Sequence, residues 1–175
     1  MFRNRRNRST RGQTMVEFAL ILPIMMFLLT GFFDLGRVVL AHDALGHAAR
    51  EAARYAIVHG SSPGSLCPVG PLPAGVTAPT ASPTCPYPSP SRESIRIEAR
   101  EQAAVAGSTV TVEVCYGQGC VGDTDAPDAE GNPAANTRGT PVTVTVHTTV
   151  HMAAGSLLGI TSFDVTSSST MLVNY

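Results

Sequence analysis

The chain has 175 residues, enough for one domain or for one domain plus an anchor. Its formal net charge of -1 excludes a broadly cationic nucleic-acid-binding protein. All twelve basic residues are arginine, and five of them lie in the first eleven positions: Arg3, Arg5, Arg6, Arg8 and Arg11. The remainder holds seven basic and thirteen acidic residues, a net charge of -6. The chain therefore begins with a basic leader of residues 1–12, ahead of an acidic remainder.

An apolar run follows the leader. Residues 18–33 contain no charged side chain, and Glu17 and Asp34 bound them. As a helix these sixteen residues span about 24 Å, slightly less than the roughly 30 Å hydrocarbon core, and apolar neighbours lengthen the run on both sides. We therefore predict a single membrane-spanning helix over residues 13–40, loosened or kinked at Pro23, with Asp34 and Arg37 near the outer headgroups.

The arginines of the leader predict the orientation of this helix. Under the positive-inside rule, the N-terminus lies in the cytoplasm and the bulk of the chain outside. A cleaved secretory signal is the alternative, but no small-residue cleavage site follows the apolar run. We therefore favour an anchor that stays with the protein.

The residues just before the apolar run can be interpreted in two ways. Thr14 and Glu17 have the spacing of a capping box, which predicts Thr14 as the N-cap of the helix. A capping box does not explain a carboxylate at the membrane edge directly behind a basic leader, where its charge is costly without a partner.

The same residues carry a family resemblance. A basic leader, Gly12, four residues, Glu17 and Phe18 before an apolar helix resemble the processing site of type IV pilin-like proteins. The longer stretch 11–56 resembles the TadE-like pseudopilins of tight-adherence (Flp) pilus systems. The elements that carry this resemblance are Arg11-Gly12-Gln13, Val16-Glu17-Phe18-Ala19, Leu22-Pro23, Gly31, Asp34-Leu35-Gly36-Arg37 and Ala48-Ala49-Arg50-Glu51-Ala52-Ala53-Arg54-Tyr55.

The resemblance implies a minor, non-enzymatic pseudopilin in a bacterial cytoplasmic membrane, without a cofactor. A prepilin peptidase would cut between Gly12 and Gln13, recognising Glu17 and Phe18. The new ammonium group of Gln13 would pair with Glu17 of a neighbouring subunit, so that Glu17 sets the assembly register. Implied partners are the peptidase, a sister pseudopilin, the major pilin, the pilus platform and the lipid bilayer. The alternative is an exported binding module on an uncleaved signal anchor.

The rest of the chain predicts an exported head, and with it an α+β, pilin-like fold: a long N-terminal helix packed on a small antiparallel sheet. The helix continues over residues 41–60 with an apolar stripe of Leu35, Val38, His42, Leu45, Ala49, Ala52 and Ala56. Residues 61–91 hold nine of the thirteen prolines and predict a loop. The head, 92–175, contains a helix at 92–106 with Ser91 as its N-cap, and strands at 109–116, 141–152 and 163–174.

Four cysteines allow three disulfide pairings. We favour Cys67–Cys85 and Cys115–Cys120, because each closes a local loop in an oxidising compartment. A zinc site is the alternative, disfavoured because the sequence has no C-x-x-C pair. Free thiols remain an option if the host does not oxidise exported proteins.

Other motifs give weaker signals. His147 and His151 lie on one strand about 13 Å apart, too far to share a metal ion. Residues 60–64 match G-x-S-x-G, but they follow a helix rather than a strand, which favours a chance match. The acidic side chains of the loop after the first strand are usually just solvated, with calcium binding as a minor alternative: Asp123, Asp125, Asp128 and Glu130.

Overall fold

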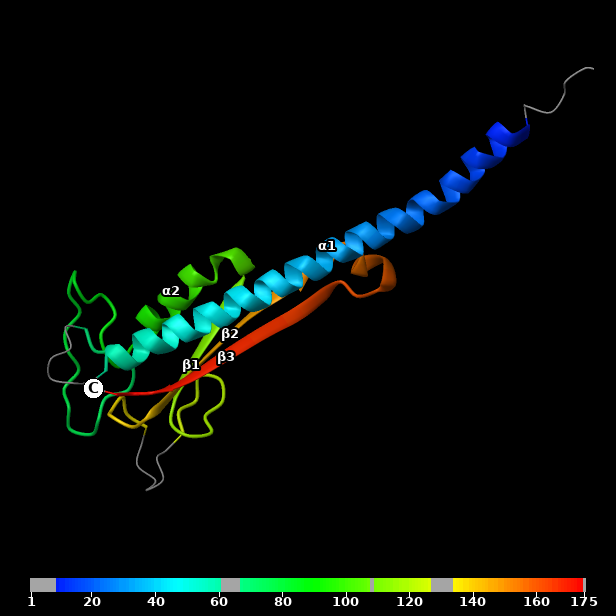
Figure 1. The fold of residues 1–175 in the computed structure, drawn as a ribbon. Helices are drawn as coiled ribbons and strands as arrows, with labels where there is room; N and C mark the ends of the chain where they lie inside the picture. Colours follow the sequence, from blue (N-terminus) through cyan, green and yellow to red (C-terminus); the bar gives the residue numbers. More distant parts are fainter. Residues whose placement is uncertain (1–8, 61–66, 108, 127–133, 175) are drawn as a thin grey trace, which may run out of the picture. The chain divides into compact units, whose positions relative to one another are not determined.

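The computed structural model describes residues 9–60, 67–107, 109–126 and 134–174. They form a long helix, α1 (Ser9–Val58), a short helix, α2 (Glu93–Gln102), and three strands, β1 (Val110–Tyr116), β2 (Pro141–His151) and β3 (Ser162–Leu172). Two short 3-10 turns, η1 (Ala104–Ala106) and η2 (Gly155–Leu158), complete the elements. The α+β class predicted from the sequence is confirmed (Figure 1).

The chain divides into two compact units. The anchor unit comprises Met1–Arg37 and His151–Phe163, and the head unit comprises Val38–Val150 and Asp164–Tyr175. The helix α1 contributes to both, because it runs for 50 residues without a break. Pro23 lies inside it, where the ring removes one backbone hydrogen bond but does not end the helix.

The three strands form one antiparallel sheet in the order β1-β2-β3. β1 pairs with β2 so that Val112 faces Val146 and Val114 faces Val144. Between β2 and β3, the hydroxyls of Thr143 and Thr170 meet at 2.8 Å. The alternation predicted from the sequence is confirmed, because every second residue of β2 from Val142 to Val150 is buried.

The core of the head unit lies between α1 and this sheet. The contacting face of α1 is nearly all alanine, which lets the sheet approach the helix closely; its buried members are Ala41, Leu45, Ala48, Ala49, Ala52, Ala53 and Ala56. Opposite them lie valines of the sheet, each worth about 1.5–3 kcal/mol when fully buried. The predicted stripe is correct from Leu45 onward. It is wrong at Leu35 and His42, which are exposed, because the buried face passes through Ala41 instead.

The helix α2 covers a further part of the core beside α1 (Figure 1). Its predicted apolar residues Ile95, Ala99 and Ala103 are all buried. The helix predicted over 92–106 is divided after Gln102, where the chain tightens into η1. The predicted N-cap is wrong by one residue, since Arg92 is the N-cap of α2, although the Ser91 hydroxyl accepts the backbone N–H of Glu93 at 3.2 Å.

The proline-rich segment, residues 61–91, is held near its start by two backbone hydrogen bonds, one to His59 and one to Ser91 at the segment's own end. The N–H of Val69 donates to the carbonyl of His59 at 2.8 Å, and the N–H of Gly70 donates to the carbonyl of Ser91 at 2.9 Å. Gly70 has φ +79° and lies against the Tyr116 ring, where a Cβ atom would be 2.2 Å from the Tyr116 hydroxyl oxygen. Only glycine satisfies both conditions.

Candidate functional site

The residues of the predicted processing site lie within the first turns of α1. The helix begins at Ser9, so Gly12, Gln13, Glu17 and Phe18 are all helical. The predicted capping box is therefore wrong: Thr14 lies inside the helix and not at its N-cap.

Gly12 occupies open space. A Cβ atom added there would have no neighbour within 4 Å, and the same holds for Gly31 and Gly36 farther along α1. Glycine costs about 1 kcal/mol in a helix relative to alanine. Within the described part of the chain, neither packing nor backbone strain requires glycine at position 12.

The carboxylate of Glu17 is bonded within its own helix. The side-chain amide of Gln13, one turn earlier, donates to Glu17 Oε1 at 3.3 Å. Both residues are exposed, and so are the apolar neighbours Met15, Val16 and Phe18. A long bond from a neutral amide compensates a carboxylate only weakly compared with a cationic donor.

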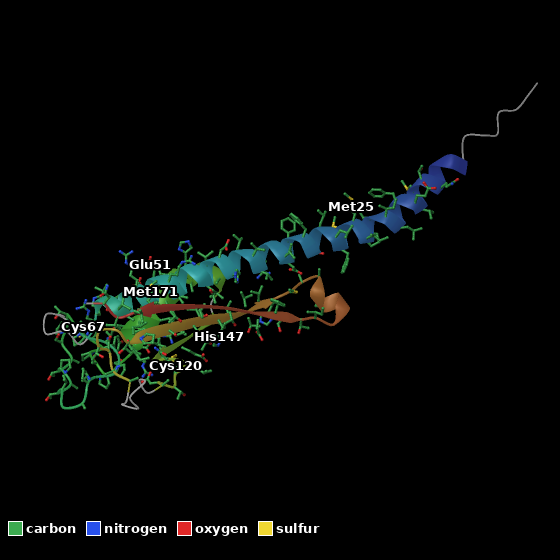
Figure 2. The ribbon with its side chains drawn as sticks, turned by 60° about the horizontal axis from the view of Figure 1, so that its bottom comes forward. Met25, Glu51, Cys67, Cys120, His147 and Met171 are labelled. Atoms are coloured by element: carbon green, nitrogen blue, oxygen red, sulfur yellow. A yellow bond between two sulfur atoms is a disulfide. The ribbon has the colours of Figure 1, made fainter. Side chains whose placement is uncertain are left out.

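The apolar run that follows, residues 18–33, is largely exposed in the described structure. Gly12–Val58 is the one helix in the described residues that is long and apolar enough to cross a membrane, and none of its most apolar stretch is buried within the structure. Figure 2 shows Met25 projecting from α1 with no other part of the anchor unit against it. The Thr30 hydroxyl turns back to the Met26 carbonyl at 2.8 Å, so the polar group of the run is satisfied internally.

Asp34, at the end of the run, has a partner that sequence reasoning missed. Its Oδ2 atom accepts the backbone N–H of Ala154 at 2.7 Å, and its side chain is buried. Ala154 lies in the turn between β2 and β3, 120 residues later. The sequence shows only an uncharged segment between two strands, and that pattern alone does not predict a contact with Asp34.

The acidic loop after β1 forms an ion-pair cluster with α2. Asp125 pairs with Arg92 and accepts the backbone N–H of Tyr116 at 2.8 Å. Asp123 pairs with Arg96 at 2.9 Å and accepts the backbone N–H of Val114 at 2.9 Å. Burial opposes ionisation of Asp123, but these hydrogen bonds and the arginine charges hold its pKa below the usual value.

These contacts bear on the calcium alternative. Both described carboxylates of the loop already bind arginine and backbone donors, which is a structural use of their charge. Asp128 and Glu130 lie outside the described residues. Among the described residues, no three His, Cys, Asp or Glu side chains are grouped to hold a metal ion.

The cysteines form two disulfides, Cys67–Cys85 and Cys115–Cys120. One cysteine of each pair, Cys67 and Cys120, is labelled in Figure 2. Both bridges belong to the head unit. They fasten the proline-rich segment and the loop that follows β1.

Several predicted features lie outside the described residues or apart from the site. The leader residues 1–8 and residues 61–64 of the G-x-S-x-G match are outside them. His147 and His151 both lie on β2, as predicted.

Comparison with known proteins gives one match. The sequence model of a family described as TadE-like protein matches residues 12–54. No curated protein and no solved structure matches the chain. The matched segment begins at Gly12 and includes Gln13, Glu17, the apolar run, Asp34 and most of the alanine-rich face. Residues 12–54 are thus similar to TadE-like proteins, in agreement with the resemblance found in the sequence.

Proposed function

We propose that the chain is a minor, non-enzymatic pseudopilin that takes part in assembling a tight-adherence (Flp) pilus or a related secretion machine. The observation that carries this proposal is the TadE-like match over residues 12–54, on a helix whose apolar run is exposed. An exposed apolar helix is unfavourable in water, and it is stabilised in a bilayer or by packing against similar helices. The helix over residues 13–40 is the proposed membrane anchor.

A prepilin peptidase would cut between Gly12 and Gln13. That bond lies in a helix, which must unwind before a protease can reach the backbone. Gly12 makes unwinding easier by about 1 kcal/mol. Nothing in the described structure requires a glycine at position 12, and this supports a role for Gly12 in processing and not in folding.

Processing would also change the electrostatics of the helix end. It removes all five leader arginines, each worth about 1 kcal/mol beside an anionic lipid surface. It also creates an ammonium group on Gln13. An ammonium from a neighbouring subunit is a stronger partner for Glu17 than the amide 3.3 Å away in its own helix. Glu17 would then fix the axial register between subunits.

The head fits an extracytoplasmic location. Its two disulfides form and persist in oxidising compartments, which supports the orientation with the N-terminus in the cytoplasm. The proposed partners are the prepilin peptidase, a sister pseudopilin, the major pilin and the membrane platform of the pilus.

The mass of the membrane-extracted protein tests this proposal. Loss of residues 1–12 supports the pseudopilin, whereas an intact N-terminus supports an exported binding module on an uncleaved anchor. Deletion of the coding region, scored for surface pili and for secretion of the major pilin, gives the functional readout. Normal piliation in the deletion strain would contradict the proposal.

A further inference from the structure

The turn between β2 and β3 is an uncharged segment beside the end of the apolar run. Residues 152–163, which comprise the turn and the first two residues of β3, read MAAGSLLGITSF and contain no acidic, basic or histidine side chain. Histidine and aspartate flank the segment, at His151 and Asp164. Ile160 and Phe163 are 53% and 51% exposed, so the described structure does not cover them.

Asp34 holds this turn at a defined level of α1. The hydrogen bond from Ala154 to Asp34 lies one residue beyond the uncharged run 18–33. Both partners belong to the anchor unit, and Figure 1 shows the turn beside α1. If the run spans the membrane, the turn is therefore at the boundary between hydrocarbon and headgroups.

The exposure pattern of the apolar run, residues 18–33, shows which of its faces leads to the turn. Within residues 18–33, only Phe27 and Gly31 are half-buried, and the others are exposed. Positions 27, 31 and 34 share one face of a helix, the face on which Asp34 meets the turn. Phe27 precedes Asp34 by seven residues, or about 10 Å along the axis. A Cβ atom added at Gly31 would have no neighbour within 4 Å, so nothing in the described structure packs on this face one turn before Asp34, and the face is open to lipid.

The backbone of the turn suits a partly dehydrated setting. Several of its N–H groups have partners within the chain: Met152 donates to the Thr161 carbonyl at 3.1 Å, and Ile160 donates to the Gly155 carbonyl at 2.9 Å. The Ser156 hydroxyl donates to the Ala153 carbonyl at 2.7 Å. Satisfied polar groups remove the main cost of placing irregular backbone near hydrocarbon.

We propose that the β2–β3 turn and the first two residues of β3, together residues 152–163, form a second membrane contact that inserts Ile160 and Phe163 into the outer interface of the bilayer spanned by α1. The occupant of this apolar surface is lipid, because the surface is continuous with the anchor. The bond to Ala154 also compensates the Asp34 carboxylate at a depth where an unpaired charge is costly. This proposal rests on the membrane anchorage proposed above.

The chain has no tryptophan, so one introduced tryptophan reports its own surroundings without interference. The full chain, reconstituted in phosphatidylcholine–phosphatidylglycerol vesicles, would carry Ile160→Trp at the turn, Val121→Trp in the head or Phe32→Trp in the anchor. Val121 and Phe32 are 79% and 74% exposed, so neither control disturbs packing. Lipids brominated at shallow or deep acyl positions then quench tryptophan according to its depth.

The expected result is strong quenching of Ile160→Trp by shallow bromines, a blue-shifted emission, and neither effect at Val121→Trp. Phe32→Trp tests the anchor separately. If Phe32→Trp is quenched and Ile160→Trp behaves like Val121→Trp, the turn is not a lipid contact and the proposal fails while the anchor stands. If Phe32→Trp is not quenched, the anchor itself is wrong.

A second variant tests the role of Asp34. Asp34→Leu removes the acceptor of the Ala154 N–H, so quenching of Ile160→Trp should fall toward that of Val121→Trp while Phe32→Trp stays quenched. Unchanged quenching of Ile160→Trp would show that Asp34 does not hold the turn at the interface.

Discussion

Asp123 and Val114 are joined by a hydrogen bond of 2.9 Å, in which the carboxylate accepts the backbone N–H of a residue on β1. Arg96 of α2 contacts the same carboxylate, also at 2.9 Å. The loop after β1 is thereby bound to a strand and a helix at once. Because these contacts favour the ionised form, the pKa of Asp123 lies below 3.8 in the folded chain.

The first prediction concerns acid stability. A depressed folded-state pKa contributes stability above the unfolded value near 3.8, and that contribution is lost as pH falls through the lower folded value. Asp123→Asn should therefore destabilise the head at neutral pH by up to about 1 kcal/mol, because the pair is partly exposed, and the difference should vanish in strong acid. Thermal unfolding of the full chain in detergent, recorded against pH, measures it. Glu101→Gln, an exposed change on α2, is the control, and a pH-independent difference would contradict the prediction.

The second prediction concerns the disulfides. Replacing Cys67 and Cys85 together by serine releases a crosslink between residues 18 apart and should cost about 3 kcal/mol by loop entropy. The same change at Cys115 and Cys120, five residues apart, should cost about 2 kcal/mol. Denaturant unfolding of both double variants gives the comparison. A larger loss for the shorter loop would show that chain entropy is not the main effect.

The third prediction separates processing from folding at Gly12. Gly12→Ala adds a methyl group in open space and raises helix propensity, so stability should not fall. Cleavage after position 12 should slow or stop, because the bond becomes harder to unwind and the peptidase meets a larger side chain. Mass spectrometry of membrane extracts measures the processed fraction. Gly36→Ala, with the same open space on the same helix, is the matched control; equal processing of both variants would remove Gly12 from the site.

The fourth prediction tests the register role of Glu17. Glu17→Gln keeps the size of the side chain and removes the charge that would pair with the Gln13 ammonium of a neighbour. We expect copurification of the processed form with the major pilin to fall, and mass spectrometry measures separately how far the loss of the carboxylate slows processing. Glu51→Gln is the control, since Glu51 is exposed on α1 and points away from the sheet (Figure 2). Normal assembly with Glu17→Gln would exclude the register role.

The fifth prediction tests the alanine face of α1. Ala49 is fully buried against the core, so Ala49→Leu should destabilise the head by about 1–3 kcal/mol through overpacking. His47→Leu adds the same side chain at an exposed position and should change stability by less than about 0.5 kcal/mol. Thermal unfolding of both variants decides the point, and equal effects would show that the alanine face is not tightly packed.

The features predictable from the sequence are those with a local signal. The three strands lie within two residues of their expected bounds, and in β1 and β2 alternating valines mark one buried face, such as Val142 and Val144 on β2. The helix α1 was expected from its uncharged run and its alanine spacing. In both cases the pattern repeats over several residues, so that a single exception does not hide it.

The features that sequence could not supply depend on distant contacts. The bond between Asp34 and Ala154 joins positions 120 residues apart, and the pair Arg92–Asp125 joins positions 33 apart. Neither pair belongs to a periodic sequence pattern from which the contact could have been predicted. His42 shows the opposite error, since its three- and four-residue spacing suggested burial, but the packed face of α1 passes through Ala41.

The alanine-rich buried face of α1 limits which substitutions the head can accept. Six of its seven buried residues in the head are alanine, so almost any replacement there enlarges the side chain. A saturation library should therefore recover few substitutions on the inward face and many on the outward face. Substitutions that alter the surface chemistry of the head without moving the helix away from the sheet are thereby confined to the outward side of the helix and to the loops.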